Sequence, residues 1–215
     1  MQPEVAREQM IKQQLRAWHV LDGRVLQTMS EVPREAFLPV AYQGLAFADA
    51  PVPIGHGQIM LAPKLQGRLL QALALTPDES VLDIGTGTGF LAACMARLAA
   101  RVSSIDIHPE LVGQAADRLS RSGVRNVTTA VADAMEYEPQ GQFDAIAVTS
   151  SLPVYVDRFQ NLLVPGGRLF VVVGKPPIEE AWLVTRDRDG FRREVLFETE
   201  VPAMINAPLP EAFVF

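Results

Sequence analysis

Three glycines on alternate positions follow an apolar segment in VLDIGTGTGF, residues 81–90. Gly85, Gly87 and Gly89, with Thr86 between the first two, let the backbone take conformations that other residues avoid and let a ligand approach the main chain. A helical pattern, LAACMARLAA, takes over at once. The free N–H groups and the positive dipole end of such a helix attract anionic groups. The turn is therefore predicted to bind a nucleotide cofactor.

The glycine spacing narrows the choice of cofactor. The turn reads acidic-x-G-x-G-x-G from Asp83 onward, whereas a pyrophosphate is cradled by G-x-G-x-x-G. This favours S-adenosylmethionine (AdoMet), which carries a carboxylate and a ribose but no phosphate, over NAD. A glycine turn that binds nothing is the structural alternative, but it would cost unfolded-state entropy for no gain in packing.

Acidic residues are expected at the ends of three strands, and ligands of doubly wound sheets lie at those ends. Asp106 is predicted to accept hydrogen bonds from the ribose hydroxyls, and Asp133, with Ala134, to take the exocyclic amine of adenine. Asp83 is predicted to orient the glycine turn or to reach the methionine part of the cofactor through a water. Each could alternatively be a solvated turn aspartate. The predicted cofactor-binding residues are Asp83, Gly85, Thr86, Gly87, Gly89, Asp106, Ile107, His108, Asp133 and Ala134.

The elements that must position these residues alternate between strand and helix. Helices are expected over about 63–75, 88–100 and PELVGQAADRLSRSG, and strands over 80–84, RVSSIDI, VTTAVAD and FDAIAVTS. A helix over DRFQNLLVPGG and an apolar strand RLFVVVG follow. Such alternation predicts an α/β fold with a mostly parallel, doubly wound sheet. A hairpin around Asp189-Gly190 adds an antiparallel pair at its end.

The N-terminal part has a different character. Helices are predicted over 3–17, as an amphipathic segment, and over 22–30, with Asp22 as N-cap. Five prolines and three glycines then interrupt the chain from Val32 to Pro63. Because a connection this long is usually functional or disordered, its aromatic residues favour a packed, functional segment. We expect residues 1–62 to form a helical and lid segment that caps an AdoMet-binding core over 63–215, in one compact domain.

Composition excludes several classes of protein. The 215 residues are 48% apolar and 20% charged, typical of a globular protein, and without a membrane-length apolar run or signal peptide we expect a cytoplasmic enzyme with no membrane partner. The net charge of −6 argues against long nucleic acids as partners. Cys94 is the single cysteine and is expected to be a buried hydrophobe. With three scattered histidines, the sequence predicts no metal site.

The glycine turn with Asp106 and Asp133 resembles the class I AdoMet-dependent methyltransferases. More narrowly, VPREAFLP, APVPIGHGQIMLAP, FDAIAVTSSLP, LLVPGGRLFVVVG and a VP pair at 201–202 resemble the protein-L-isoaspartate O-methyltransferase family, in order from about residue 3 to 205. The resemblance implies a seven-stranded, Rossmann-like sheet and methyl transfer from AdoMet, leaving S-adenosyl-L-homocysteine. It also implies a peptide or protein acceptor, methylated on the carboxylate of an isoaspartyl residue as a step of protein repair. Monomer and homodimer remain open.

The resemblance also places the substrate lid, over residues 53–63, and exposes a departure within it. Ile59 stands where the family usually has threonine, and Leu61 where it has its active-site serine. Gln58, Leu61 and His56 are the candidate catalytic positions, although His56 could equally cap a turn. An ionised carboxylate needs alignment and desolvation more than a general base, so the missing hydroxyl costs about 1.5–3 kcal/mol rather than all activity.

Two other functions stay open at this point. The apolar replacements make the pocket less hospitable to a buried carboxylate, so the chain could methylate another acceptor, such as an apolar small molecule. It could also be a non-catalytic AdoMet-binding protein. If the pocket is otherwise that of the family, Leu61→Ser is expected to raise isoaspartyl activity at least several-fold.

Overall fold

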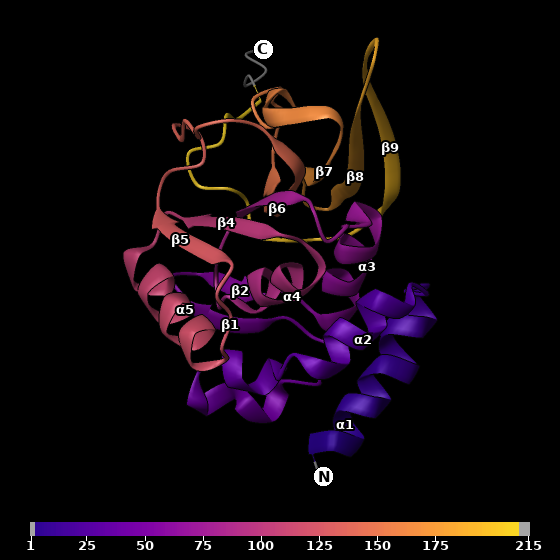
Figure 1. The fold of residues 1–215 in the computed structure, drawn as a ribbon, viewed down its shortest axis with the longest axis vertical. Coiled ribbons are helices and arrows are strands. Elements are labelled where there is room, and N and C mark those ends of the chain that lie inside the picture. Colours follow the sequence, from indigo (N-terminus) through magenta and orange to yellow (C-terminus); the bar gives the residue numbers. More distant parts are fainter. Residues whose placement is uncertain (1–2, 211–215) are drawn as a thin grey trace.

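The computed structural model describes residues 3–210 and has a seven-stranded sheet at its centre (Figure 1). The strand order is β5-β4-β3-β6-β7-β8-β9, with the first five parallel and the last two antiparallel. From β3 the chain adds strands on one side as far as β5 and then crosses to add β6 on the other side, so the switch point of the doubly wound fold lies between β3 and β6. The strands are β3 Ser80–Ile84, β4 Arg101–Asp106, β5 Val127–Val131, β6 Phe143–Leu152, β7 Leu163–Lys175, β8 Ile178–Asp187 and β9 Gly190–Glu198. The predicted fold class is confirmed, and the terminal hairpin turns at residues 188–189, one position before the expected pair.

Helices α3 Pro63–Leu73, α4 Phe90–Leu98 and α5 Pro109–Arg121 flank the parallel strands. Proline opens α3 and α5, where its missing N–H costs nothing. Gly89 precedes α4 with φ 86°, and a Cβ at this position would lie 3.1 Å from the Cβ of Ala115 in α5. The third glycine of the turn therefore lets α4 and α5 pack closely.

Apolar residues of β3 point alternately to the two faces of the sheet. Val81 belongs to one buried cluster, with α3, α4 and the N-terminal segments, while Leu82 and Ile84 belong to a second. The second cluster is covered by loops and a single 3-10 turn, Gln160–Leu162. The helix predicted over DRFQNLLVPGG is therefore wrong. Pro153 before it and the Pro-Gly-Gly sequence within it leave too few residues to nucleate a stable helix.

The N-terminal segment forms one helical stretch of changing pitch: α1 Pro3–Gln9, a π-helical turn Met10–Leu15 and a 3-10 turn Arg16–Trp18. Helix α2, Gly23–Glu31, begins as predicted, because the Asp22 side chain accepts hydrogen bonds from the N–H groups of Arg24 and Val25. Two 3-10 turns, Arg34–Phe37 and Val40–Leu45, lead to an antiparallel hairpin of β1 Val52–Gly55 and β2 Gln58–Met60.

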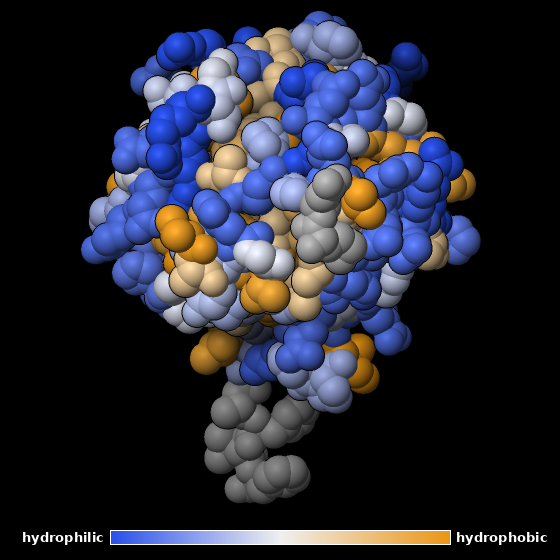
Figure 2. All heavy atoms as spheres, turned by 90° about the horizontal axis from the view of Figure 1, so that it is seen from below, coloured by the Kyte–Doolittle hydropathy of each residue, from blue (hydrophilic) through white to orange (hydrophobic). Residues whose placement is uncertain are grey.

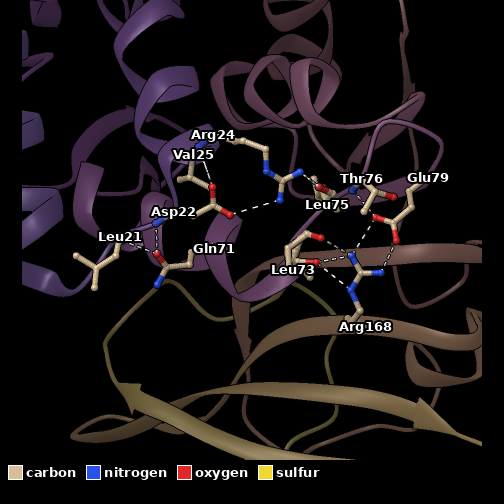
Figure 3. A network of polar contacts seen from close by, with 11 residues as sticks. Leu21, Asp22, Arg24, Val25, Gln71, Leu73, Leu75, Thr76, Glu79 and Arg168 are labelled. Carbon is tan, nitrogen blue, oxygen red and sulfur yellow. Dashed lines mark hydrogen bonds and ion pairs between the residues drawn. The ribbon is translucent and has the colours of Figure 1, made fainter.

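Polar contacts join the N-terminal helices to α3 and the sheet (Figure 3). The Gln71 side chain of α3 accepts hydrogen bonds from the chain before α2, including the N–H of Asp22 at 3.0 Å. Arg24 of α2 donates to a carbonyl beyond the end of α3. Arg168 of β7 pairs with Glu79 at 2.5 Å and donates to carbonyls at the end of α3. The apolar core is likewise shared between the two parts, while the boundary at residue 62 stays a prediction.

Several large apolar side chains of residues 3–210 are exposed at the surface, among them Leu21, Val40 and Leu209. On the face seen in Figure 2 apolar residues lie among hydrophilic side chains without joining into one broad area. Among residues 3–210, no helix is both long enough and apolar enough to cross a membrane.

Candidate active site

A cleft lies at the carboxyl ends of β3, β4, β5 and β6. Its position is that of the ligand crevice in doubly wound sheets. The walls come from the glycine turn, the β1–β2 hairpin, the ends of β4 and β6, the loop after β5 and the segment after β9. The lining residues are Ile54, Gln58, Ile59, Ile84, Gly85, Gly87, Ile105–His108, Ala132–Ala134, Thr149, Ser150 and Pro202–Ile205.

The glycine turn forms the floor of this cavity. Gly85 and Gly87 have φ values of 101° and 50°, a region that favours glycine. A Cβ on Gly85 would lie 2.2 Å from Oγ1 of Thr149, and one on Gly87 would lie 3.3 Å from Cδ1 of Ile54. The Gly85 N–H donates to the carbonyl of Ile105 at 2.8 Å. The turn thus holds its backbone against β4 and β6 where a side chain would not fit.

Asp106, the last residue of β4, is fixed in the cavity wall by backbone donors. Its Oδ2 accepts from the N–H of Gly87 at 2.9 Å, and its Oδ1 accepts from the N–H of His108 at 3.0 Å. A carboxylate has about four acceptor positions, so two such bonds leave others free. The free acceptor positions of the Asp106 carboxylate could take the two hydroxyls of a ribose, as the sequence predicts.

Asp133 lies on the neighbouring wall, in the loop after β5. Its Oδ1 accepts from the N–H of Met135 at 2.8 Å, and its Oδ2 accepts from the Asn206 amide at 2.6 Å. Asn206 belongs to the segment after β9, which runs back across the sheet (Figure 1). That segment therefore closes the cavity on the side of Asp133.

Asp83 lies behind the turn rather than in the cavity lining. It is fully buried, and its Oδ2 accepts from Ser104 Oγ at 2.7 Å, which in turn lies 2.7 Å from Oγ1 of Thr86. Burial raises the pKa of Asp83 to about 7, a shift that the nearby Asp106 charge reinforces and the Ser104 hydrogen bond opposes. This chain of contacts favours the first of the two roles predicted for Asp83, orienting the turn.

The β1–β2 hairpin covers the cavity through Gln58 and Ile59. His56 sits at its tip with φ 54°, and its ring stacks on that of His108, with 4.5 Å between centroids and 22° between planes. Its Nε2 also lies 3.7 Å from a carboxylate oxygen of Glu110. His56 therefore fastens the hairpin to the start of α5, while Nε2 of His108 is buried and has no hydrogen-bond partner among the described residues.

Leu61 does not line the cavity. Its side chain is 6% exposed and packs in the apolar core, and its carbonyl accepts from Arg34 Nη2 at 2.8 Å. Arg34 is itself buried, donates also to the carbonyl of Ala46 and to the Gln66 side chain, and lies 4.9 Å from the ring centroid of Phe90. Burial lowers the pKa of Arg34 to about 9. The P-R-x-x-F element thus supports the end of the lid from beneath.

The predicted site residues fall into two groups. Those that line the cavity together are Gln58, Gly85, Gly87, Asp106, Ile107, His108, Asp133 and Ala134. Those outside its lining are His56, Leu61, Asp83, Thr86 and Gly89. Sequence reasoning did not place Thr149, Ser150 and Pro202–Ile205 in the site. A polar pair at a strand end could have indicated the first two, whereas nothing local marks the last four.

Other reactive groups offer no second centre. Cys94 is fully buried on α4, and burial raises the pKa of its thiol far above the usual range, which agrees with the predicted role as a buried hydrophobe. Within the described part of the chain, no group of three or more His, Cys, Asp or Glu side chains is placed to hold a metal ion.

The doubly wound sheet, the glycine turn after β3 and the acidic residue at the end of β4 together define a class I AdoMet-dependent methyltransferase. The model of the family described as protein-L-isoaspartate(D-aspartate) O-methyltransferase matches residues 5–201, and the chain belongs to that family.

Relatives of the same family cover most of the chain. A protein-L-isoaspartate O-methyltransferase of Picosynechococcus is 38% identical over 99% of this chain and 90% of its own length. One of Koribacter versatilis is 36% identical over 93% and 90%, and one of Aeropyrum pernix is 37% identical over 88% and 75%. These matches establish the family over three quarters or more of the length of each relative.

Solved structures agree in fold. A crystal structure described as a putative protein-L-isoaspartate O-methyltransferase of Plasmodium falciparum, in complex with S-adenosyl-L-homocysteine, superposes with a TM-score of 0.81 at 21% identity. It covers 92% of this chain and 97% of that one. A second protein-L-isoaspartate O-methyltransferase gives a TM-score of 0.77 at 24% identity. The likeness extends to the N-terminal segments, since both alignments cover 92% of the chain.

Proposed function

We propose that this chain transfers the methyl group of AdoMet to the carboxylate of isoaspartyl residues in damaged peptides and proteins. The observation that carries the proposal is one cavity, lined by the glycine turn and Asp106 on one side and by Gln58 of the hairpin on the other, in a member of this family. Two ligands that must react can therefore meet in one cleft.

The cavity residues fit the cofactor. The glycines of the turn have no Cβ, so their backbone can lie close to neighbouring groups and to a ligand. Asp106 keeps free acceptor positions next to the turn, and the Asp133 carboxylate is a second acceptor. In the proposal Asp106 binds the ribose hydroxyls and Asp133 the adenine amine, while Ile107, His108 and Ala134 contact the adenosine. Bound AdoMet supplies an electrophilic methyl group on a sulfonium sulfur.

The protein residues contribute alignment and exclusion of water. The acceptor carboxylate is already ionised at neutral pH, so no side chain needs to remove a proton from it. One carboxylate oxygen bonds to the methyl carbon as the carbon–sulfur bond breaks, and the bonding electron pair stays on sulfur. Ile54, Ile59 and Ile84 give the cavity wall an apolar portion. Because apolar side chains exclude water, electrostatic interactions between the bound ligands become stronger there.

The remaining parts of the proposal concern its setting. The net charge of −6 supports a chain that acts on peptides rather than on long nucleic acids. We place it in the cytoplasm as a monomer or homodimer. An altered acceptor or a non-catalytic role is not favoured, since the relatives carry the isoaspartyl methyltransferase name across nearly their whole length.

The test compares an isoaspartyl peptide with its aspartyl isomer, each offered with methyl-labelled AdoMet. Methyl incorporation into the isoaspartyl peptide alone is expected. Asp106→Ala is the matched control, because it removes the proposed ribose acceptor and should abolish AdoMet binding in calorimetry. Equal labelling of both isomers, or labelling of neither while AdoMet still binds, would contradict the proposed acceptor.

A further inference from the structure

The acceptor carboxylate needs hydrogen-bond donors, and the cavity offers few. Neither Lys nor Arg is among its lining residues, so, beside the sulfonium charge of AdoMet, hydrogen bonds from uncharged groups must help to hold the carboxylate. Leu61 and Ile59, at the positions where the family usually carries hydroxyls, supply none. A buried carboxylate without donors would be costly, so the donors must lie elsewhere in the wall.

Strand β6 departs from regular geometry where it reaches the cavity. It takes four steps from Ala147 to Ser151 while β7 takes two, from Phe170 to Val172. Successive residues of a regular strand point to opposite faces, yet Thr149 and Ser150 both line the cavity. The irregular register thus brings two consecutive hydroxyl-bearing residues to the wall of one cavity, and bulges are common beside active sites.

Three consecutive hydroxyls in this bulge have different partners. Thr149 Oγ1 donates to the carbonyls of Ile84 and Gly85, at 3.0 and 3.3 Å. Ser151 is 1% exposed, and its hydroxyl lies 3.2 Å from the Glu179 carboxylate. For Ser150, which is only partly buried, the structure gives no hydrogen bond from the hydroxyl to any described residue. It is thus the hydroxyl of the three that can donate to a ligand.

Strand order separates this hydroxyl from the adenosine end of the cavity. Along the sheet edge the order is β5, β4, β3, β6, which places Ser150 on the opposite side of the glycine turn from Asp106 and Asp133. With neighbouring strands about 4.8 Å apart, β6 lies roughly 10 Å from β4 and roughly 14 Å from β5. Ser150 therefore lies away from the proposed ribose and adenine acceptors, on the side of the cavity left for the acceptor peptide.

The same cavity holds a second unengaged donor on the lid side. The Gln58 side chain lines the same cavity from the hairpin, and the structure gives its amide no hydrogen-bond partner among the described residues. A carboxylate between Gln58 and Ser150 would be held from the lid and from the sheet together. The segment after β9 keeps the bulge in place, since the N–H of Met204 donates to the Ser151 carbonyl at 2.8 Å.

We propose that the Ser150 hydroxyl, with the Gln58 amide, binds and orients the acceptor carboxylate, in a cavity where Ile59 offers no hydroxyl. This inference rests on the proposed function. It makes Ser150 a substrate-binding residue that accounts for isoaspartyl activity in a lid with apolar side chains at positions 59 and 61.

The test is a cycle of two enzymes and two peptides. Wild type and Ser150→Ala are each titrated, in saturating S-adenosyl-L-homocysteine, with a fluorescent isoaspartyl peptide and with the same peptide carrying a carboxamide in place of the free carboxylate. Affinity is read by fluorescence anisotropy. Ser150→Ala is expected to weaken the isoaspartyl peptide about ten- to hundred-fold, the loss of one hydrogen bond to a charged group. The carboxamide peptide and the affinity for S-adenosyl-L-homocysteine should stay within a factor of about three.

Two further measurements keep the result specific. Ser150→Thr retains the hydroxyl and should restore most of the affinity, and the urea midpoint of Ser150→Ala should match that of wild type. Equal weakening of both peptides, or weaker binding of S-adenosyl-L-homocysteine, would assign the hydroxyl to structure or to the cofactor and overturn the proposal. Unchanged discrimination in Ser150→Ala would overturn the role of Ser150 alone. A wild type that does not discriminate between the peptides would overturn the proposed function itself, and the role of Ser150 with it.

Discussion

Gly85→Ala tests whether the glycine turn is required for its conformation or for the space beside it. Gly85 has φ 101°, and an added Cβ would meet Thr149 Oγ1 at 2.2 Å. Gly55, at the hairpin, has φ 99° but nothing within 4 Å of the added Cβ. Both alanine variants pay the same backbone strain, about 1–3 kcal/mol. The collision is therefore the part of the cost that belongs to Gly85 alone.

The free-energy cost of the collision follows from the contacts of Thr149. Either its hydroxyl rotates away, giving up its bonds to the carbonyls of Ile84 and Gly85, or the turn moves into the cavity. Losing such a bond costs about 1 kcal/mol, and a hydroxyl left buried without a partner costs about 1–3 kcal/mol. If the turn moves, the same free energy appears as roughly five- to hundred-fold weaker AdoMet binding.

Calorimetry measures the affinity for AdoMet, and urea unfolding measures the stability, so the two assays distinguish a displaced turn from a rotated Thr149 hydroxyl. Gly85→Ala should lose affinity or stability beyond Gly55→Ala by about 1–3 kcal/mol. Thr149→Ala in the Gly85→Ala background removes the colliding atom, since the next Thr149 atom is 3.6 Å away, and should recover most of the loss. If Gly85→Ala matches Gly55→Ala in both assays, or if the double variant is no better, the reasoning from the close approach is refuted.

Three other predictions come from buried residues around the cavity. Leu61→Ser should lower the free energy of unfolding in urea by about 2–5 kcal/mol and give no gain in methylation, because the side chain at position 61 lies in the core. Ile59→Thr places a hydroxyl in the cavity and should raise isoaspartyl labelling. A Leu61→Ser enzyme that is faster than wild type and equally stable would contradict this prediction. Arg34→Lys should lose about 3 kcal/mol, because an ammonium cannot reproduce the planar contacts of the guanidinium, and a melting temperature equal to that of wild type would count against it. Asp83 has its pKa raised to about 7 from about 3.9 when unfolded, so its contribution to stability is full below about pH 4 and is lost as pH rises to about 7, by at most about 1.4 kcal/mol per pH unit. Asp83→Asn should flatten that slope in urea unfolding, and parallel slopes would exclude the buried proton.

The sheet and the cofactor side of the cavity could be predicted because their signals are local. Alternating strands and helices, the glycine spacing and an acidic residue at a strand end each depend on a few neighbouring residues. Position 61 depends on contacts that are distant in sequence: the motif predicts a place in the substrate pocket, whereas the structure packs the Leu61 side chain in the core and bonds its carbonyl to Arg34. A catalytic role for Leu61 stays a prediction. The prediction of a helix before β7 was wrong. The apolar residues of that segment pack in the second core cluster, but the backbone forms only one 3-10 turn. The free hydroxyl of Ser150 depends on a register shift between two strands, which no single segment specifies.

The route of the segment after β9 has a consequence for how the chain acquires its site. The cavity joins residues from Ile54 to Ile205, and Asn206 ties the last wall to the loop after β5. Contacts so far apart in sequence form late, because the intervening chain must be ordered first. During synthesis or refolding, the β5-β4-β3-β6 half could therefore be ordered while the pocket still lacks a side. Ligand binding would then report the finished fold, and AdoMet, by binding only that state, would draw the population toward it.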